Sequence, residues 1–304
     1  MYHVNSMPIE TNLILVAQLS FVIRCHVSVV PNWITSHQCV SCPPTTTFNC
    51  PVKSELSTRM EFDQKVVLIT GASAGIGEAC ALKFAKLGAL LSLVGRNVNN
   101  LNRVADKCAE YSGHKPLAIK ADISVAEDVE KIIKETVEHF GKIDVLINNA
   151  GFLLMAGIME DISNFDRMMA TNVRGTYLMT QQAIPHLILT KGNIVNVSSI
   201  VSTVAIPAMM SYSMTKAAVD MFTKCVALDL APKGVRVNAV NPGPVNTTLF
   251  KRSGFNDEVN DKIFENVAAA LPLRKLTTSE DVAELVAFLA SDKANCITET
   301  CKRK

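Results

Sequence analysis

Tyr212 and Lys216 stand four positions apart, and together they could transfer a proton. In a helix this spacing puts both side chains on one face. A free tyrosine has a pKa of about 10. A nearby ammonium favours the phenolate, so the pair predicts a general acid/base that works near neutral pH. Ser199, 13 positions before Tyr212, could donate a hydrogen bond to a substrate oxygen on which negative charge develops. The alternatives are a solvated helix face for the pair and Ser198 in place of Ser199.

A glycine-rich loop earlier in the chain, Thr70–Gly77, has the composition of a phosphate-binding turn. Gly71 can adopt a tight turn, and Gly75 and Gly77 allow close approach to the backbone. Free N–H groups at the start of a following helix favour an anion. We therefore expect a bound nucleotide, with a glycine turn that holds no ligand as the alternative. The expected contacts in this loop are Gly71, Ser73, Ala74, Gly75, Ile76 and Gly77.

The residues after the second predicted strand indicate which dinucleotide binds. An acidic side chain at this place binds the ribose 2′-hydroxyl of NAD. Here the strand ends in Gly95-Arg96-Asn97, with no acid. The guanidinium of Arg96 suits a 2′-phosphate, which favours NADP over NAD and makes Arg96 and Asn97 expected contacts. A surface arginine that only packs is the alternative.

Short apolar runs alternate with amphipathic stretches from Lys65 onward, and these elements must position the reactive side chains. Repeated strand–helix units force parallel pairing with right-handed crossovers. The sequence therefore predicts an α/β fold, a Rossmann-type doubly wound parallel sheet with helices on both faces. The expected strands are 65–70, 90–94, 115–120, 145–148, 193–197 and 235–240. The expected helices are 75–87, 98–108, 125–140, 163–187, 212–230 and 279–290.

The overall composition excludes some classes of protein. The 304 residues carry a formal net charge of +2 and are 48% hydrophobic, which is globular composition without a basic footprint for nucleic acid. Residues 1–60 hold only five charged side chains, so we expect a poorly ordered extension there and a single domain over residues 61–304. The apolar run Leu13–Ile23 is too short to span a bilayer. We expect a cytoplasmic protein, with membrane attachment through residues 11–30 as the alternative.

The order of these motifs resembles the short-chain dehydrogenase/reductase family, most of all its 3-oxoacyl-reductase-like branch, over roughly residues 62–297. The resemblance implies hydride transfer between a nicotinamide cofactor and a carbonyl or secondary alcohol, with Tyr212 as the proton donor. The motifs that carry it are Thr70-Gly71-x-x-x-Gly75-x-Gly77, Asp122, Asn148-Asn149-Ala150-Gly151, Asn172, Ser199, Tyr212-x-x-x-Lys216 and Pro242–Thr247.

The resemblance also implies roles for single residues. Asn172 would anchor a water that relays protons, although an asparagine in a helix can also bond its own backbone. Lys216 would bind the nicotinamide ribose, and Asp122 the adenine amino group. The remaining implied cofactor contacts are Asn149, Ala150 and Gly151 along the nucleotide cleft and Val245 and Thr247 at the nicotinamide amide.

Two departures from the family pattern concern activity. Ser202 stands where the family often has glycine, three residues after Ser199. The chain also ends shortly after the predicted helix 279–290, so we expect the last strand of the sheet to be missing. A missing strand exposes its neighbour as an edge. This expectation places a homodimer or homotetramer in question and makes a protein that binds cofactor without turnover the alternative function.

The predicted substrate is an uncharged, largely apolar small molecule, because no basic side chain is placed to hold a carboxylate. The six histidines have no paired metal spacing, and we expect no metal. The expected lining residues, which could equally pack in the core, are Leu153, Leu154, Met155, Ala205, Ile206, Met209, Met210, Leu249 and Phe250.

Overall fold

The computed structural model describes residues 60–303, except 156, 160, 246 and 248–256. Residues 1–59, with the apolar run Leu13–Ile23, lie outside the described residues, as do Leu249 and Phe250. The described strands form one seven-stranded parallel sheet in the order β3-β2-β1-β4-β5-β6-β7. They are β1 (Val66–Thr70), β2 (Leu90–Gly95), β3 (Leu117–Lys120), β4 (Val145–Asn148), β5 (Asn193–Val197), β6 (Arg236–Asn241) and β7 (Cys301–Arg303).

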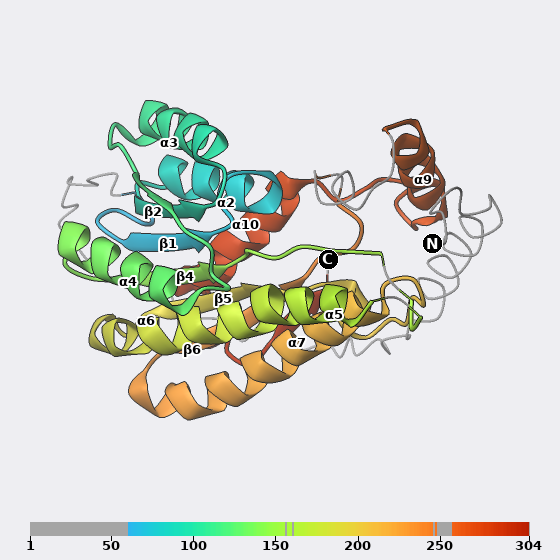
Figure 1. Cartoon of the computed structure of the whole chain (residues 1–304). Helices are drawn as coiled ribbons and strands as arrows, with labels where there is room; N and C mark the ends of the chain where they lie inside the picture. Colours follow the sequence, from blue (N-terminus) through green and yellow to red (C-terminus); the bar gives the residue numbers. More distant parts are fainter. Residues whose placement is uncertain (1–59, 156, 160, 246, 248–256, 304) are drawn as a thin grey trace, which may run out of the picture.

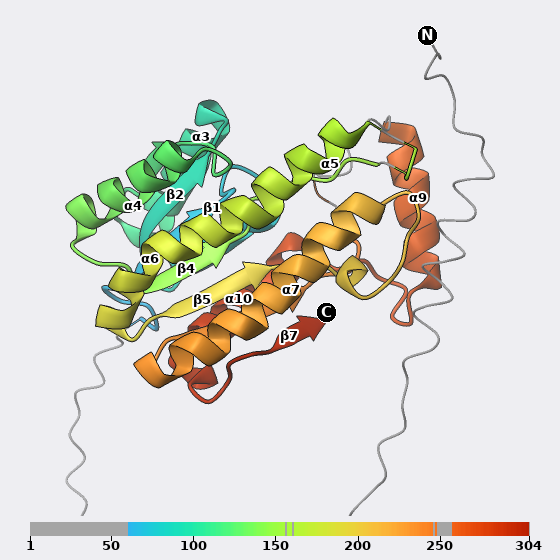
Figure 2. The same ribbon diagram turned by 60° about the horizontal axis from the view of Figure 1, so that its bottom comes forward.

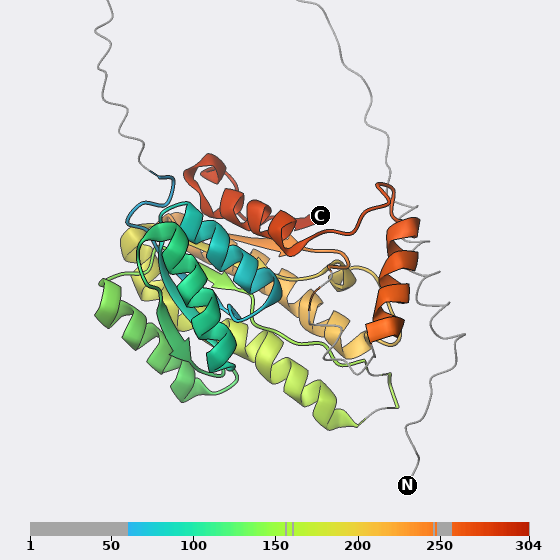
Figure 3. The same cartoon turned by 90° about the horizontal axis from the view of Figure 1, so that it is seen from above.

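Helices cover both faces of this sheet, as predicted (Figure 1). One face carries α2 (Gly75–Lys86), α3 (Val98–Ser112) and α10 (Ser279–Ala290), which Figure 3 views from above. The other face carries α4 (Ala126–Phe140), α6 (Thr176–Thr190) and α7 (Met210–Leu230). A further helix, α9 (Asp257–Ala270), lies off the carboxyl ends of the strands (Figure 2). Within the described part, no helix is both long and apolar enough to cross a bilayer.

The strands are apolar on both faces because each face is covered by helices. Val67 and Ile69 in β1 join a buried cluster with Phe84 of α2 and Val286 of α10. Leu68, between them, points to the opposite face and joins the cluster under α4, α6 and α7. This alternation fixes which side chains of β1 face each layer of helices. It also holds the carboxyl ends of the strands in one row.

The predicted single helix over 163–187 is wrong in detail. The segment consists of α5 (Ile162–Met168), a π-helical stretch η1 (Met169–Gly175) and α6. Apolar spacing predicts a continuous helix, but it does not distinguish the wider π-helical turn. This wider turn contains Asn172.

The expected loss of the last strand is also wrong. β7 pairs in parallel with β6, with Ala239 opposite Cys301 and Asn241 opposite Arg303. The sequence Cys-Lys-Arg has no apolar alternation, and an edge strand does not require one. Thr298 and Thr300, just before β7, are hydrogen-bonded to Val237 and Asn238 of β6. The missing strand was a reason for the alternative of a catalytically silent protein, and the structure contains a strand at that place.

Candidate active site

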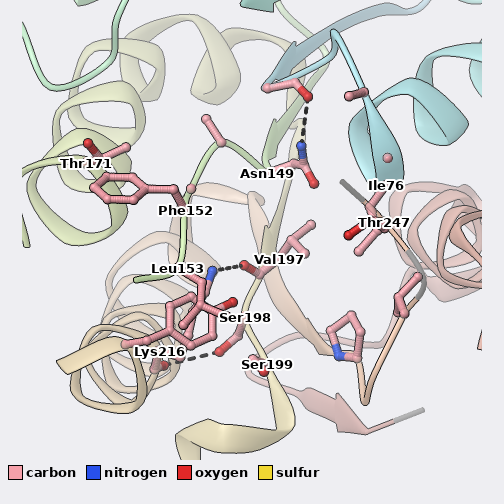
Figure 4. A pocket seen from close by; sticks show the side chains of 18 of the residues that line it. Ile76, Asn149, Phe152, Leu153, Thr171, Val197, Ser198, Ser199, Lys216 and Thr247 are labelled. Atoms are coloured by element: carbon pink, nitrogen blue, oxygen red, sulfur yellow. Dashed lines mark hydrogen bonds between the residues drawn. The ribbon is translucent and has the colours of Figure 1, made fainter. Parts of the chain in front are cut away.

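A cavity of about 520 Å³ opens at the carboxyl ends of the strands. Residues from the segments after β1 to β6 line it, which is the usual place for a ligand in a sheet of this topology. In Figure 4, Ile76 and Thr247 lie on the opposite side of this cavity from Phe152 and Thr171. Two of the expected residues, Gly77 and Asn172, do not line the cavity. Those that do are Gly71, Ser73, Ala74, Gly75, Ile76, Arg96, Asn97, Asp122, Asn149, Ala150, Gly151, Ser199, Tyr212, Lys216, Val245 and Thr247.

The glycine loop packs tightly against the segment after β4. Gly71 has a φ of +68°, and a Cβ there would lie 2.8 Å from both Ala150 Cα and Asn149 Nδ2. A Cβ on Gly77 would collide with the carbonyl oxygen of Gly71. The loop therefore requires glycine at both positions, and it brings the first turn of α2 against the cavity.

Thr70, which the sequence analysis left without a role, joins the two loops. Its hydroxyl accepts hydrogen bonds from the backbone N–H groups of Asn149 and Ala150, both at 3.0 Å, and donates to the Ile147 carbonyl at 3.3 Å. The side-chain amide of Asn149 donates to the Thr70 carbonyl at 3.0 Å (Figure 4). In the sequence, the only sign of this role was that a threonine begins the glycine motif.

Arg96 and Asp122 meet at one end of the cavity. Nη1 of Arg96 lies 3.2 Å from Oδ2 of Asp122, while Oδ1 accepts hydrogen bonds from the amide and hydroxyl of Ser124. Burial by itself would raise the pKa of Asp122, but the Ser124 hydrogen bonds and the Arg96 charge outweigh it and hold the pKa below its usual value. The side chain of Asn97 caps α3 by accepting from the Asn100 amide at 3.0 Å. The acid and the guanidinium therefore neutralise each other beside the glycine loop.

The predicted reactive pair lies at the base of the cavity. Tyr212 is 8% exposed, and Nζ of Lys216 lies 5.5 Å from the centre of its ring. Burial raises the pKa of Tyr212 well above its usual value, and a hydrogen bond with Ser199 acts in the opposite direction. The expectation that Lys216 lowers this pKa is wrong, because desolvation of the phenolate outweighs the nearby cation. A phenol in this environment keeps its proton at neutral pH and can donate it.

The two neighbouring serines have different partners. Ser198 is buried, and its hydroxyl donates to the Lys216 carbonyl at 3.1 Å (Figure 4). Ser199 begins the short 3₁₀ turn Ile200–Ser202; its hydroxyl accepts from the Val201 amide at 3.4 Å and lies close enough to the Tyr212 phenol to oppose the rise in the pKa of Tyr212. The hydroxyl placed beside the phenol is therefore that of Ser199.

Lys216 is held by the sheet. Its Nζ donates to the Val197 carbonyl at 2.8 Å, at the end of β5 (Figure 4). Burial lowers the pKa of Lys216 to about 8, and the charge of Asp220 opposes this. Lys216 is therefore an ammonium close to its titration midpoint near neutral pH.

Asn172 lies behind the cavity lining and bonds a different segment from its own. Oδ1 accepts from the Phe152 amide, and Nδ2 donates to the Phe152 carbonyl, both at 3.0 Å. Nδ2 also donates to the Thr215 hydroxyl at 3.1 Å. The alternative of a bond to its own helix backbone is wrong. Asn172 connects the segment after β4 with the helix that carries Tyr212 and Lys216.

The remaining wall of the cavity is apolar. Of the expected substrate contacts, Leu153, Ile206 and Met209 line it. Leu154 and Met155 pack against the neighbouring core cluster, Ala205 is exposed, and Met210 does not line the cavity. The sequence analysis missed lining residues in the Ser199 turn, in the segment after β4 and in α9. Those in α9 were missed because they lie far along the chain from the motifs. The missed residues are Phe152, Ile200, Val201, Phe264 and Val267.

Comparison with known proteins gives a consistent result. A family model described as enoyl-(acyl carrier protein) reductase matches residues 71–301. The chain is 37% identical over 239 residues to meso-2,3-butanediol dehydrogenase of Serratia marcescens, covering 78% of this chain and 92% of that protein.

Two solved structures are similar to the whole domain. A short-chain dehydrogenase/reductase of unknown function from Caenorhabditis elegans, solved with cofactor, has a TM-score of 0.77 and 34% identity, covering 80% of this chain and 94% of that chain. The 3-ketoacyl-(acyl-carrier-protein) reductase of Brucella melitensis complexed with NADH has a TM-score of 0.71 and 36% identity, covering 79% and 96%.

Proposed function

The chain belongs to the short-chain dehydrogenase/reductase family and is an oxidoreductase of carbonyl and alcohol groups, and from this premise we propose that it reduces an uncharged, largely apolar ketone with NADPH. The domain that does so is residues 61–304. The observation that carries the proposal is the grouping of Ser199, Tyr212 and Lys216 at the base of the cavity.

The cradle formed by the glycine loop fits a dinucleotide. Gly71 and Gly77 leave no room for a Cβ, which keeps the loop close to the segment after β4 and brings the N–H groups at the start of α2 to the cavity, where they would bind the pyrophosphate. Asp122 would meet the adenine, while Asn149, Ala150 and Gly151 would line the path to the nicotinamide, which Val245 and Thr247 would contact. When bound, the cofactor supplies the hydride from its nicotinamide ring.

Arg96 supports NADP over NAD. No acid follows β2 to bind a ribose 2′-hydroxyl, and the Arg96 side chain is 62% exposed at the rim of the cavity. Its hydrogen bond to Asp122 uses one nitrogen, so other N–H groups of the guanidinium can bind a 2′-phosphate.

The side chains at the base of the cavity have different roles in proton transfer. Ser199 donates a hydrogen bond to the carbonyl oxygen as negative charge develops there. Tyr212, which is protonated at neutral pH, then gives its phenolic proton to that oxygen. The Lys216 ammonium stabilises the phenolate that forms and binds the nicotinamide ribose. Asn172 would anchor a water that relays a proton to this group from solvent.

The apolar wall supports the substrate class. Leu153, Ile206, Met209 and Val267 are at most 6% exposed, and they surround the space next to Tyr212. A carboxylate placed among these side chains would lose its hydration without gaining a partner. A hydrophobic ketone loses little by the same transfer.

Replacement of one oxygen atom tests the proposal. In the full chain, Tyr212→Phe is expected to lower ketone turnover with NADPH at least a hundredfold, because the proton donor is lost. The dissociation constant of NADPH, followed by fluorescence, should change less than about twofold. Tyr177→Phe, at a 49% exposed tyrosine on α6, is the matched control and should behave as the wild type. Equal turnover by Tyr212→Phe would refute the assignment, and binding of NADPH without any wild-type turnover would identify a silent family member.

A further inference from the structure

A buried carboxylate lies one helical turn after Lys216 on α7. Asp220 is only 9% exposed, and both of its oxygens accept from Nδ2 of Asn241, at 3.0 and 2.8 Å. A buried carboxylate is costly unless charges or hydrogen bonds compensate it. The mechanism described above does not use Asp220, and it requires an explanation.

Asn241 connects Asp220 to the turn that carries Ser199. It is the last residue of β6, and its Nδ2 also lies 3.3 Å from the Ser199 carbonyl and 3.2 Å from the Ser202 hydroxyl. The backbone supports the same junction, because the Ile200 amide donates to the Pro242 carbonyl at 3.0 Å. Ser202, the departure from the family glycine, therefore supplies an acceptor in this junction.

Asp220 also acts on Lys216 through its charge. Burial disfavours the ammonium and lowers the pKa of Lys216 to about 8, whereas the Asp220 charge raises it. On α7, Lys216 stands four positions after Tyr212, whose ring its Nζ contacts, and four before Asp220, whose charge acts on it. The other polar neighbour of Nζ is the neutral Val197 carbonyl. Asp220 is thus the negative charge that favours the ammonium.

We propose that Asp220 is a positioning residue of the reaction, which holds the Ser199–Ser202 turn through Asn241 and keeps Lys216 in its charged form. The inference rests on the proposed function for the reaction itself, but the link between Asp220 and Lys216 can be measured without turnover. The Asp220 carboxylate thereby determines both the position of the Ser199 hydroxyl and the charge state of Lys216.

The test compares two nearly isosteric charge removals on α7 of the full chain. Asp220→Asn removes the buried carboxylate, and Asp229→Asn removes an exposed one on the same helix. Two quantities are measured: the pH dependence of kcat for ketone reduction, and the titration of the Lys216 side chain by NMR of the [¹³Cε]lysine protein, assigned with Lys216→Arg. A third variant, Asp220→Glu, restores the charge.

The expected result is specific to Asp220. Asp220→Asn should move the Lys216 midpoint and the alkaline limb of kcat down by about one pH unit and lower kcat about fivefold at pH 8, with KM for the ketone changed less than about twofold. Asp220→Glu should recover most of the shift, and Asp229→Asn should match the wild type. An unchanged Lys216 midpoint in Asp220→Asn overturns the proposal. If the midpoint moves but the wild type reduces no ketone, the proposed function fails and the link between Asp220 and Lys216 stands.

Discussion

Arg96 is the residue on which the proposed preference for NADP depends. Its ion pair with Asp122 is exposed, and such pairs contribute little to stability. The guanidinium is therefore available for a second partner at small cost. It lies beside the glycine loop at the cavity, where the proposed function would put the adenosine part of the cofactor.

Replacement of this guanidinium separates the two nicotinamide cofactors. Arg96→Ser is expected to weaken NADPH binding about tenfold, equivalent to about 1.4 kcal/mol, because charge-assisted bonds to a phosphate are lost. NADH binding should change less than twofold. The check is fluorescence titration with both cofactors. Arg103→Ser, which removes an arginine paired with Glu78 on the surface, is the control. Equal weakening of NADH and NADPH would contradict the assignment.

At this scale, sequence reasoning located residues that belong to short motifs and missed those that depend on tertiary contacts. The cavity-lining positions of Ser199, Tyr212 and Lys216 were predicted because their spacing is local to β5 and α7. The partners of Arg96 and Asn172 were not, since each lies in a segment distant along the chain. The direction of the Tyr212 pKa shift was wrong because burial does not appear in a motif.

Among the elements, the loop between β1 and α2 has the tightest packing requirement. The backbone of Gly77, in the first turn of α2, lies against the Gly71 carbonyl and the Asn149 side chain. A carbonyl held by a strand end cannot move aside as a flexible side chain can. The helix start therefore accepts no side chain at this position.

A single methyl group tests this requirement. Gly77→Ala is expected to destabilise the fold by about 2 kcal/mol, the usual cost of overpacking, and to weaken NADPH binding. Urea unfolding followed by circular dichroism measures the first effect. Gly157→Ala is the control, because a Cβ there has nothing within 4 Å. A stability of Gly77→Ala within 0.5 kcal/mol of the control would show that the loop can adjust.

The predicted elements agree with the structure where the apolar period is strong. β1, β4 and β5 were predicted to within one residue of their observed ends. η1 and β7 were missed, because a π-helical turn preserves the apolar character of its helix and an edge strand needs none. Both errors concern elements that tertiary neighbours define.

For the whole molecule, the C-terminal segment closes one edge of the sheet. The Glu299 amide donates to the Val237 carbonyl at 2.9 Å, and the Ala239 amide donates to the Thr300 carbonyl at 2.7 Å. β7 then continues along β6 as far as Asn241. The strand end that bears Asn241 is therefore supported from the outside of the sheet.

Truncation measures this support. A chain that ends at Ile297 loses these hydrogen bonds and is expected to lose about 3 kcal/mol at roughly 1 kcal/mol for each net bond. Its Tm should fall by roughly 6–12 °C. A chain that ends at Arg303 keeps β7 and is the control. Differential scanning calorimetry of both makes the comparison. Melting of the shorter chain within about 1 °C of the control would contradict the structural role of β7.

The packing of α10 on α2 has a consequence for biosynthesis. Val282, Val286 and Leu289 complete the cluster that contains Phe84, and Glu284 bonds Lys83 at 2.6 Å. On the ribosome, α2 emerges roughly ten to forty seconds before its partner at ordinary rates of translation. During that interval Phe84 and its neighbours lack the apolar side chains of α10 that pack on them in the finished fold. The half of the domain that is made first can therefore complete this cluster only after synthesis has reached α10.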